Sequence, residues 1–437
     1  MAILDVSRQL IDRRRESQMR VFMSRRSFLS ATGALALGAP IEARAQPYCS
    51  DATAGRALAI QTPRPLGVIS KRVQWGTAID ASGLYDPALV AAIRGESPRF
   101  LAIANGLKFG NLHAQSMTYR NNAGESTWAE CDDTVALAKE LGVPIRGDCL
   151  AWNDWLPNWL TDITRKRAKG WQDQLRSDFE THFEGVFAHF QHMNPNPLRW
   201  CGVINEPFNP WVMNGGDPSW RKGTWLDAFG YEADGVPRYI HSAFALGERY
   251  SPGLHCALFI NEASCENDRF GPAVRPAYLK LIDSLQRAGR RVDAVGLECH
   301  LVPQWMSDPA HPDWRPFVQF LRDVAQRGVE IYLTELDVND CGLRDIAQRD
   351  AQVETYMRSL VSAALEVPAV TMISNWNFSD KSSWLRETGS AGRLNIESWA
   401  KCVPAPECPR PALYDETMKP KRARQGLAEA LGGRLPR

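Results

Sequence analysis

Three times along this chain, a helical segment ends at a glycine and a short run of apolar residues follows. Glycine suits the position after a helix because it adopts a positive φ without a clash at Cβ. A helix that returns directly to an apolar strand is typical of a buried parallel sheet. The three units are Asp132–Leu141 with Gly142 and Val143–Leu150, Pro276–Ala288 with Gly289 and Val292–Leu297, and Pro316–Arg327 with Gly328 and Ile331–Leu336.

Five further apolar runs, rich in β-branched or aromatic residues, bring the number of predicted strands to eight. They are Val73–Ile79, Phe100–Ala104, Trp200–Ile204, Ala257–Ile260 and Val370–Ser374. Eight buried strands that alternate with helices predict an α/β fold, a closed (β/α)8 TIM barrel in a single domain. A doubly wound open sheet is the main alternative. It is disfavoured because no G-x-G-x-x-G follows the first strand.

The first 45 residues have the pattern of an export signal. Ser24–Leu29 is a twin-arginine pattern, the apolar run Phe28–Ala39 follows it, and Ala43-Arg44-Ala45 offers a cleavage site. The apolar run is shorter than the roughly 20 residues that span a bilayer. We therefore expect a twin-arginine signal peptide over 1–45, a barrel domain with a C-terminal tail over 46–437, and a periplasmic or secreted protein. An uncleaved anchor is the alternative.

Composition and charge restrict the partners. The formal net charge is +1, from 51 basic and 50 acidic residues, which favours neither nucleic acid nor an anionic membrane. Both core packing and sugar-stacking platforms explain the 15 tryptophans, and the count alone favours core packing. Export makes disulfides possible, with Cys402 and Cys408 as one candidate pair or as two free thiols. The cysteine spacings match no common zinc motif.

Two predicted strands, the fourth and the seventh, lead into a glutamate. Glu206 follows Trp200–Asn205, and Glu335 lies in Glu330–Leu336. In such a barrel, polar residues at the carboxyl ends of strands face the active site. Hydrolysis of a glycosidic bond needs one carboxylic acid to protonate the leaving oxygen and a second carboxylate to stabilise or attack the sugar carbon. The matched positions predict this chemistry. The alternative is that each glutamate caps a helix or pairs with an arginine.

Six segments carry a more specific pattern. Trp200–Phe208 is similar to W-D-V-V-N-E-P, and Ile331–Val338 is similar to I-T-E-L-D. The other four are Ala104–Phe109, Arg146–Trp159, Asp293–Leu301 and Asn375–Leu385. In their order and spread over most of residues 70–400, these segments resemble the motifs of glycoside hydrolase family 10, the endo-β-1,4-xylanase family.

The resemblance implies a role for each matching residue. Glu206 would be the general acid/base and Glu335 the nucleophile. Asn205 would bind the 2-hydroxyl of the cleaved sugar, and His300 would hydrogen-bond the nucleophile and help to keep it ionised. Asp337 and Asp380 would support neighbouring groups. The remaining expected substrate-binding residues are Asn105, Lys108, Trp152, Asn153, Glu298, Trp376 and Trp384. The family's reaction requires no cofactor and no metal ion.

Some positions depart from the family motifs. They are Ala104, Asp148, Asn153, Trp155 and Glu298, which stand where the family has glutamate, histidine, histidine, glutamine and glutamine. Glu298 adds a carboxylate near Glu335. Like charges at short distance raise the pKa of one group, so we expect this pair to titrate as a coupled unit. The departures leave the catalytic pair intact and open the question of sugar specificity.

We therefore predict a retaining, endo-acting glycoside hydrolase that cleaves β-1,4 linkages in xylan or a related plant polysaccharide. One alternative is hydrolysis of a different β-linked or decorated oligosaccharide, and another is a non-catalytic carbohydrate-binding relative. An exported cofactor enzyme is disfavoured because no cofactor-binding motif is seen. The expected partner is a polysaccharide or oligosaccharide substrate, with no nucleic acid, no membrane after signal cleavage, and a monomeric state.

Overall fold

The computed structural model describes residues 64–214, 216–340, 343–386 and 409–433. The expected signal peptide at 1–45 and the candidate pair Cys402 and Cys408 lie outside these residues, so both stay predictions. The cysteines among the described residues are free thiols. Within the same residues, no helix combines the length and the apolar character needed to cross a membrane.

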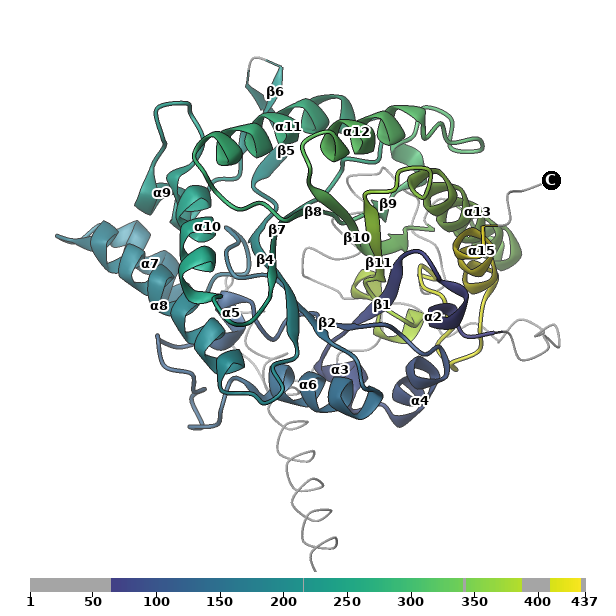
Figure 1. Cartoon of the computed structure of the whole chain (residues 1–437), viewed down its shortest axis with the longest axis horizontal. Coiled ribbons are helices and arrows are strands. Elements are labelled where there is room, and N and C mark those ends of the chain that lie inside the picture. The colour runs from purple at the N-terminus through teal and green to yellow at the C-terminus, as the bar shows by residue number, and fades with distance from the viewer. Residues whose placement is uncertain (1–63, 215, 341–342, 387–408, 434–437) are drawn as a thin grey trace, which may run out of the picture. The chain divides into compact units, whose positions relative to one another are not determined.

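Eight parallel strands form a closed barrel surrounded by helices (Figure 1). Each strand pairs with the next, and the last strand, β11, pairs with both β10 and β1, which closes the sheet. The predicted (β/α)8 barrel is confirmed, and each predicted strand is present. The strands are β1 (Gln74–Ile79), β2 (Leu101–Ile103), β3 (Ile145–Gly147), β4 (Leu198–Asn205), β7 (Ala257–Glu262), β8 (Ala294–Leu297), β10 (Glu330–Val338) and β11 (Val370–Asn375).

The helices cover the outside of the barrel, and three of them end where the glycines predicted. Gly142, Gly289 and Gly328 have φ of 69°, 70° and 71°, the left-handed conformation expected after a helix. Two starts differ, because α6 begins at Ala129 rather than Asp132, and α11 begins at Gly271 and contains Pro276 in its interior. The main helices are α4 (Pro87–Gly95), α6 (Ala129–Leu141), α8 (Trp171–Gln191), α10 (Arg238–Tyr250), α11 (Gly271–Arg287), α12 (Arg315–Ala325) and α13 (Ile346–Ala364).

Apolar side chains pack on both faces of the barrel strands. In β2, Leu101 and Ile103 join the large core beneath the helices, whereas Ala102 points into the barrel. The interior is filled by small and aromatic residues, including Ala104, Phe259 and Trp376. Because the barrel is filled, a substrate site can only lie at its carboxyl-terminal mouth, where the connecting loops meet.

A small antiparallel hairpin interrupts the barrel pattern immediately after β4. It consists of β5 (Phe208–Asn214) and β6 (Asp217–Trp220). A two-residue strand, β9 (His300–Leu301), follows β8 and pairs with β10, and the short helix η1 (Pro303–Trp305) comes next. These elements were not predicted, and they all lie in loops at the mouth of the barrel.

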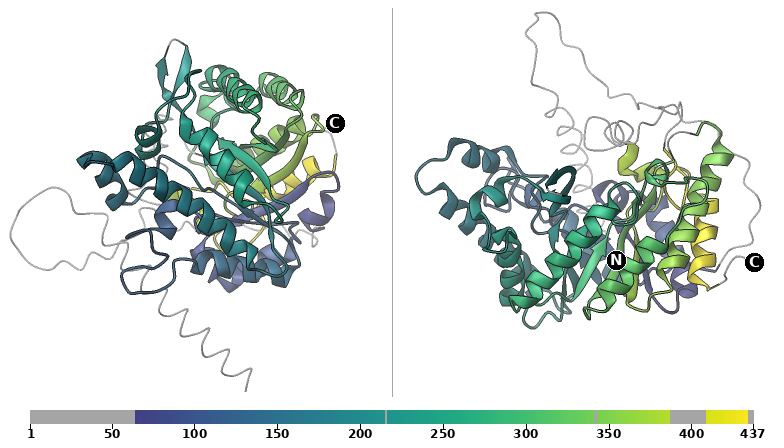
Figure 2. Two further views of the ribbon diagram at one scale, coloured as in Figure 1. Left: turned by 60° about the vertical axis from the view of Figure 1, so that its left-hand side comes forward. Right: turned by 90° about the horizontal axis from the view of Figure 1, so that it is seen from above.

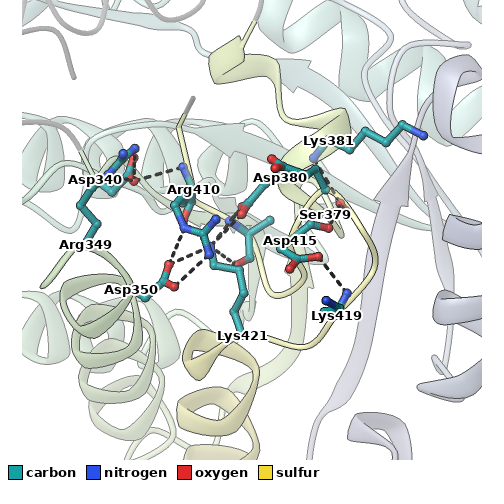
Figure 3. A network of polar contacts seen from close by, with 12 residues as sticks. Asp340, Arg349, Asp350, Ser379, Asp380, Lys381, Arg410, Asp415, Lys419 and Lys421 are labelled. Carbon is teal, nitrogen blue, oxygen red and sulfur yellow. Dashed lines mark hydrogen bonds and ion pairs between the residues drawn. The ribbon is translucent and has the colours of Figure 1, made fainter. Parts of the chain in front are cut away.

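The described part of the C-terminal tail, residues 409–433, packs onto the barrel. The helix α15 (Arg422–Leu431) lies beside α13 (Figure 1). Arg410 pairs with Asp350 at 2.9 Å, and the Lys421 ammonium pairs with Asp380 at 3.0 Å (Figure 3). Asp380 is fully buried. Asp380 therefore anchors the C-terminal segment, and this contact is a supporting role of the kind expected for it.

Candidate active site

Glu206 and Glu335 lie at the mouth of the barrel on the fourth and seventh strands in barrel order. Glu335 lies within β10 and is 6% exposed. Glu206 comes directly after β4 and has a φ of 43°. A positive φ is unfavourable for a glutamate, and such strain is typical of functional positions. The two predicted carboxyl groups are therefore brought to the same end of the barrel.

Glu335 is held in its ionised form by the groups around it. Its Oε2 lies 3.1 Å from His300 Nε2, and His300 Nδ1 lies 2.8 Å from Asp337 Oδ1. Burial alone would raise the pKa of Glu335, but the hydrogen bond and charge of His300 outweigh it and lower this pKa. Burial opposes the charge on His300, and the two carboxylates raise its pKa well above the usual value. The contact expected between His300 and Glu335 is present.

Asn261, at the carboxyl end of β7, connects the two strands that lead to Glu206 and Glu335. Its Nδ2 donates to Glu335 Oε1 at 2.8 Å and to Asn205 Oδ1 at 2.9 Å, and it lies 3.2 Å from Glu298 Oε1. Its Oδ1 accepts from Thr334 Oγ1 at 2.6 Å. Sequence analysis missed Asn261. It follows the predicted strand Ala257–Ile260 directly, so the rule that identified Glu206, a polar residue beyond an apolar strand, would have found it.

Glu206 is held by a tryptophan and an arginine. Its Oε2 accepts from Trp152 Nε1 at 3.1 Å and lies 2.7 Å from Arg221 Nη2. The same guanidinium donates from Nε to the Glu206 backbone carbonyl at 2.8 Å and pairs with Asp154 at 2.7 Å. The alternative considered for this glutamate, pairing with an arginine, is thus also realised. Sequence analysis missed Arg221, which lies 15 positions further along the chain.

Asn153 supports this arrangement from behind. Its Nδ2 donates to the Arg221 carbonyl at 3.2 Å, and its Oδ1 accepts from the Trp225 amide at 3.0 Å. Both polar groups of the buried side chain are therefore used by the loop that carries Arg221. We assign Asn153 to the support of this loop, whereas sequence analysis expected it to contact substrate.

Two further carboxyl groups at the mouth have raised pKa values. Burial, with the charges of Glu206 and Glu335, raises the pKa of Glu298 well above its usual value. Burial and Glu206 also raise the pKa of Glu262 to about 8, although Arg221 opposes the shift. The expected coupling of Glu298 with Glu335 thus has a direction. The pKa of Glu298 is raised, whereas that of Glu335 is lowered.

Asp148, one of the departures from the family motifs, is also buried beside this cluster. Its Oδ2 lies 3.8 Å from Arg146 Nη2. Burial raises the pKa of Asp148 to about 7, with Arg146 opposing the shift and Glu335 adding to it. A neutral carboxyl here offers a hydrogen-bond donor as well as an acceptor.

The other residues expected to bind substrate also lie at the mouth of the barrel. Asn105 and Lys108 follow β2, Trp152 follows β3, and Trp376 and Trp384 follow β11. Lys108 Nζ donates to Asn105 Oδ1 at 2.8 Å. It also lies 5.3, 5.0 and 5.4 Å from the ring centroids of Trp152, Trp155 and Trp376. The ammonium therefore lies within cation–π distance of three indole rings.

Asp337 supports two of the expected site residues. Its Oδ1 contacts His300, and its Oδ2 accepts from Trp384 Nε1 at 2.8 Å. The rings of His300 and Trp384 lie 4.9 Å apart. Asp337 thus orients both rings toward the mouth, in the supporting place expected for it.

Two clusters of described residues have the ligand atoms for a metal ion. They are Cys131 with Asp132 and His189, and Glu298 with His300 and Glu335. In the second cluster, both ring nitrogens of His300 are already directed at carboxylates. We therefore interpret it as a hydrogen-bonded group, in keeping with chemistry that needs only carboxyl groups.

Replacing Glu298 with glutamine should extend activity to higher pH. In the unaltered protein, a rising pH removes the proton of Glu298 and places a second negative charge beside Glu335. A glutamine side chain at this position would stay neutral with a similar shape. We expect the alkaline limb of the kcat/KM profile to move to higher pH, because this position can no longer acquire a negative charge. The measurement is kcat/KM against pH on a soluble aryl glycoside. Asp178→Asn, a carboxyl-to-amide change on α8, is the control, and an unmoved limb in Glu298→Gln contradicts the prediction.

A buried ionised carboxylate on one barrel strand and a second carboxylate on a nearby strand end are the groups that cleave a glycosidic bond. The fold and the site together define a glycoside hydrolase. Residues 68–430 match the family model described as glycosyl hydrolase family 10. The chain therefore belongs to this family.

Similar proteins agree with this placement. Endo-1,4-beta-xylanase C of Phanerodontia chrysosporium is 28% identical over 321 residues, which cover 73% of this chain and 70% of that protein. The endo-1,4-beta-xylanase of Agaricus bisporus is 26% identical over 364 residues, 83% of this chain and 92% of that one. The crystal structure of xylanase 10B from Thermotoga maritima shares the fold, with a TM-score of 0.66 and 22% identity over 84% of this chain and 98% of that chain.

Proposed function

We propose that this protein is a retaining endo-β-1,4-xylanase that acts by double displacement, with Glu335 as nucleophile and Glu206 as general acid/base. The observation that carries the proposal is the Asn261 bridge. One side-chain amide contacts Glu335 at 2.8 Å and, at 2.9 Å, the Asn205 side chain next to Glu206. It therefore holds the two catalytic strand ends in one unit. The names of the similar proteins support xylan as the substrate.

In the first step, Glu206 gives its proton to the glycosidic oxygen as the bond from that oxygen to the anomeric carbon breaks. Glu335 attacks the same carbon and forms a glycosyl ester. The carboxylate left on Glu206 is stabilised by the Arg221 guanidinium, 2.7 Å away. In the second step, Glu206 takes a proton from water, the water oxygen attacks the anomeric carbon, and Glu335 leaves as a carboxylate.

The test is a reducing-sugar assay on β-1,4-xylan, cellulose derivatives and glucomannan, together with proton NMR of the first sugar released. We expect xylan to be the best substrate, mixed short oligosaccharides to be the products, and the β-anomer to form first. Initial formation of the α-anomer would exclude double displacement. Binding to xylan without release of reducing sugar would identify a non-catalytic relative.

A second candidate substrate is a different or decorated β-linked oligosaccharide. It is favoured by Trp155, which has a φ of 54° and lies against the Lys108 ammonium at 5.0 Å. An exposed indole at this place narrows the region where the outer sugar would lie. Faster release from a substituted xylan or a β-glucan than from plain xylan, in the same assay, would favour this candidate.

We also propose that the protein is exported. The proposal rests on the twin-arginine pattern Ser24–Leu29 and the cleavage pattern Ala43-Arg44-Ala45. Export fits an enzyme whose polymeric substrate lies outside the cytoplasm. Cell fractionation of the full chain, with Arg25→Lys and Arg26→Lys together as the altered form, tests it.

A further inference from the structure

Of the two clusters with metal-ligand chemistry, the one formed by Cys131, Asp132 and His189 lies outside the catalytic site. Cys131 and Asp132 are in the first turn of α6, and His189 is in the last turn of α8. Both helices lie on the outer surface of the barrel (Figure 1 and Figure 2). Asp132 and His189 are 57 positions apart in the sequence, so a short cysteine–histidine spacing could not indicate the cluster. We call these three residues the outer cluster.

The outer cluster offers one sulfur, one oxygen and one nitrogen atom, and all three lie within 4.8 Å of one another. His189 Nε2 and Asp132 Oδ1 already face each other at 2.7 Å. Around a tetrahedral zinc ion, bonds of about 2.0–2.3 Å place the ligand atoms roughly 3.3–3.6 Å apart. Side-chain movements of about 1 Å therefore bring the three atoms to bonding distance of one ion.

The His189 ring is held in one orientation before any ion binds. The ring of Trp128, the residue directly before α6, lies parallel to it, with centroids 3.9 Å apart and an interplanar angle of 6°. Because Trp128 is buried, it forms a fixed wall against the imidazole. A ligand that is already oriented loses little conformational freedom when it binds a metal ion.

The exposure of the three side chains suits the entry of an ion from solvent. Cys131 is fully buried, whereas the side chains of His189 and Asp132 are 23% and 49% exposed. The thiol therefore forms the inner wall, and water can complete the coordination from outside. Within the described part of the chain, no lysine or arginine pairs with Asp132, so no such side chain competes with a cation for its carboxylate.

The first turn of α6 also supports the loop after β2. Glu130 Oε1 accepts from the Asn105 amide at 2.9 Å. A Cβ added at Gly106 would lie 3.0 Å from the Cys131 amide nitrogen, so the loop packs closely on this turn. An ion that fixes the start of α6 would therefore also steady the loop that carries Asn105 and Lys108.

We propose that the outer cluster binds a zinc ion through the Cys131 thiolate, the Asp132 carboxylate and the His189 imidazole. Sulfur and nitrogen ligands favour zinc over calcium and magnesium, which prefer oxygen. As the bond from zinc to sulfur forms, the thiol of Cys131 gives its proton to water. The ion links the start of α6 to the end of α8 and stabilises the folded protein, and it takes no part in the cleavage of the glycosidic bond.

The first test uses Co²⁺, which takes the same kind of ligands and absorbs light. The purified protein is freed of metal by dialysis against a chelator and is then titrated with Co²⁺. We expect a near-ultraviolet band from charge transfer between sulfur and cobalt. Cys131→Ala should abolish this band. Cys256→Ala removes another buried free thiol and should retain the band.

The second test measures stability and affinity with Zn²⁺. At about 100 times its Kd, Zn²⁺ should raise the Tm of the metal-free protein by about 3 °C. Asp132→Asn and His189→Gln should each weaken Zn²⁺ binding by about tenfold or more, as measured by competition with a chromophoric chelator. His192→Gln, which replaces an exposed histidine at the end of α8, is the control and should keep the affinity.

Absence of the sulfur band in the unaltered protein overturns the proposal, and so does a band that persists in Cys131→Ala. Asp132→Asn changes a surface side chain and keeps the test open if Cys131→Ala does not fold. Equal Zn²⁺ affinities of the unaltered and Asp132→Asn proteins would show adventitious binding only and would also overturn the proposal. None of these measurements depends on hydrolysis, so they decide the zinc site independently of the proposed function.

Discussion

The Glu335→Ala protein should lose hydrolysis of xylan by a factor of about 10⁴ or more, with its fold intact. Without the carboxylate there is no nucleophile to form the glycosyl ester. The side chain lies in a cluster that also contains His300, Asp337 and Glu298. Its removal takes away one buried negative charge, but His300 still contacts a second carboxylate, that of Asp337. The fold should therefore tolerate the substitution. Reducing-sugar release measures the loss, and circular dichroism with a melting curve checks the fold.

Added azide makes this result specific to a nucleophile. Azide can enter the space left by the carboxylate and attack the same face of the sugar, so it should restore turnover of an aryl xylobioside and yield the α-glycosyl azide. Asp178→Asn, on the outer helix α8, should leave activity unchanged. If Glu335→Ala keeps more than a trace of activity without azide, Glu335 is not the nucleophile.

The loss of rate in the Glu206→Ala protein should depend on how strongly the leaving group of the substrate requires protonation. General acid catalysis contributes typically 10²- to 10⁴-fold, so hydrolysis of xylan should fall by about 10³-fold or more. A dinitrophenyl xylobioside has a leaving group that departs without a proton. With that substrate the first step should persist, and the glycosyl-enzyme should accumulate because no base activates water. A burst of dinitrophenolate followed by slow turnover is the expected record.

Asp154 offers a matched control for Glu206, because both carboxylates pair with Arg221. Asp154→Asn removes the other carboxylate that contacts this guanidinium, at 2.7 Å, and leaves Glu206 in place. It should change xylan hydrolysis by only a few-fold. Equal losses on xylan and on the dinitrophenyl substrate in Glu206→Ala would contradict a role in proton transfer. Azide should yield the β-glycosyl azide from this variant, the opposite anomer to that from Glu335→Ala.

Parts of this site could be predicted from local sequence. Glu206 and Glu335 each follow a run of apolar residues, and such a run forms a strand wherever helices cover it. Residues at the carboxyl ends of parallel strands meet at one edge, so their proximity needs no knowledge of the loops. Asn261 has the same kind of position, but it lies outside the six segments that resemble the family motifs. Trp75 and Trp225 are core residues, as core packing predicts, whereas Trp155 and Trp211 are exposed and their use in sugar stacking stays a prediction.

Other features depend on contacts between loops that are distant in the sequence. In the sequence, nothing distinguishes Arg221 from an ordinary surface arginine. In the folded protein, the hairpin places it against Glu206. The aromatic contacts of Trp211 with Phe270 and Trp305 join three different loops. The pKa directions of Glu298 and Glu335 depend on burial and on which charges lie within a few ångströms, and neither is a property of the residue itself.

By itself the sequence determined the barrel, its strands and the identity of the two carboxyl groups, because apolar periodicity and strand ends are local properties. The tertiary structure decided in which direction the pKa of each carboxyl group shifts and which residues hold the pair together. Those properties follow from distances across the mouth of the barrel, and the chain sets these distances only once the sheet has closed.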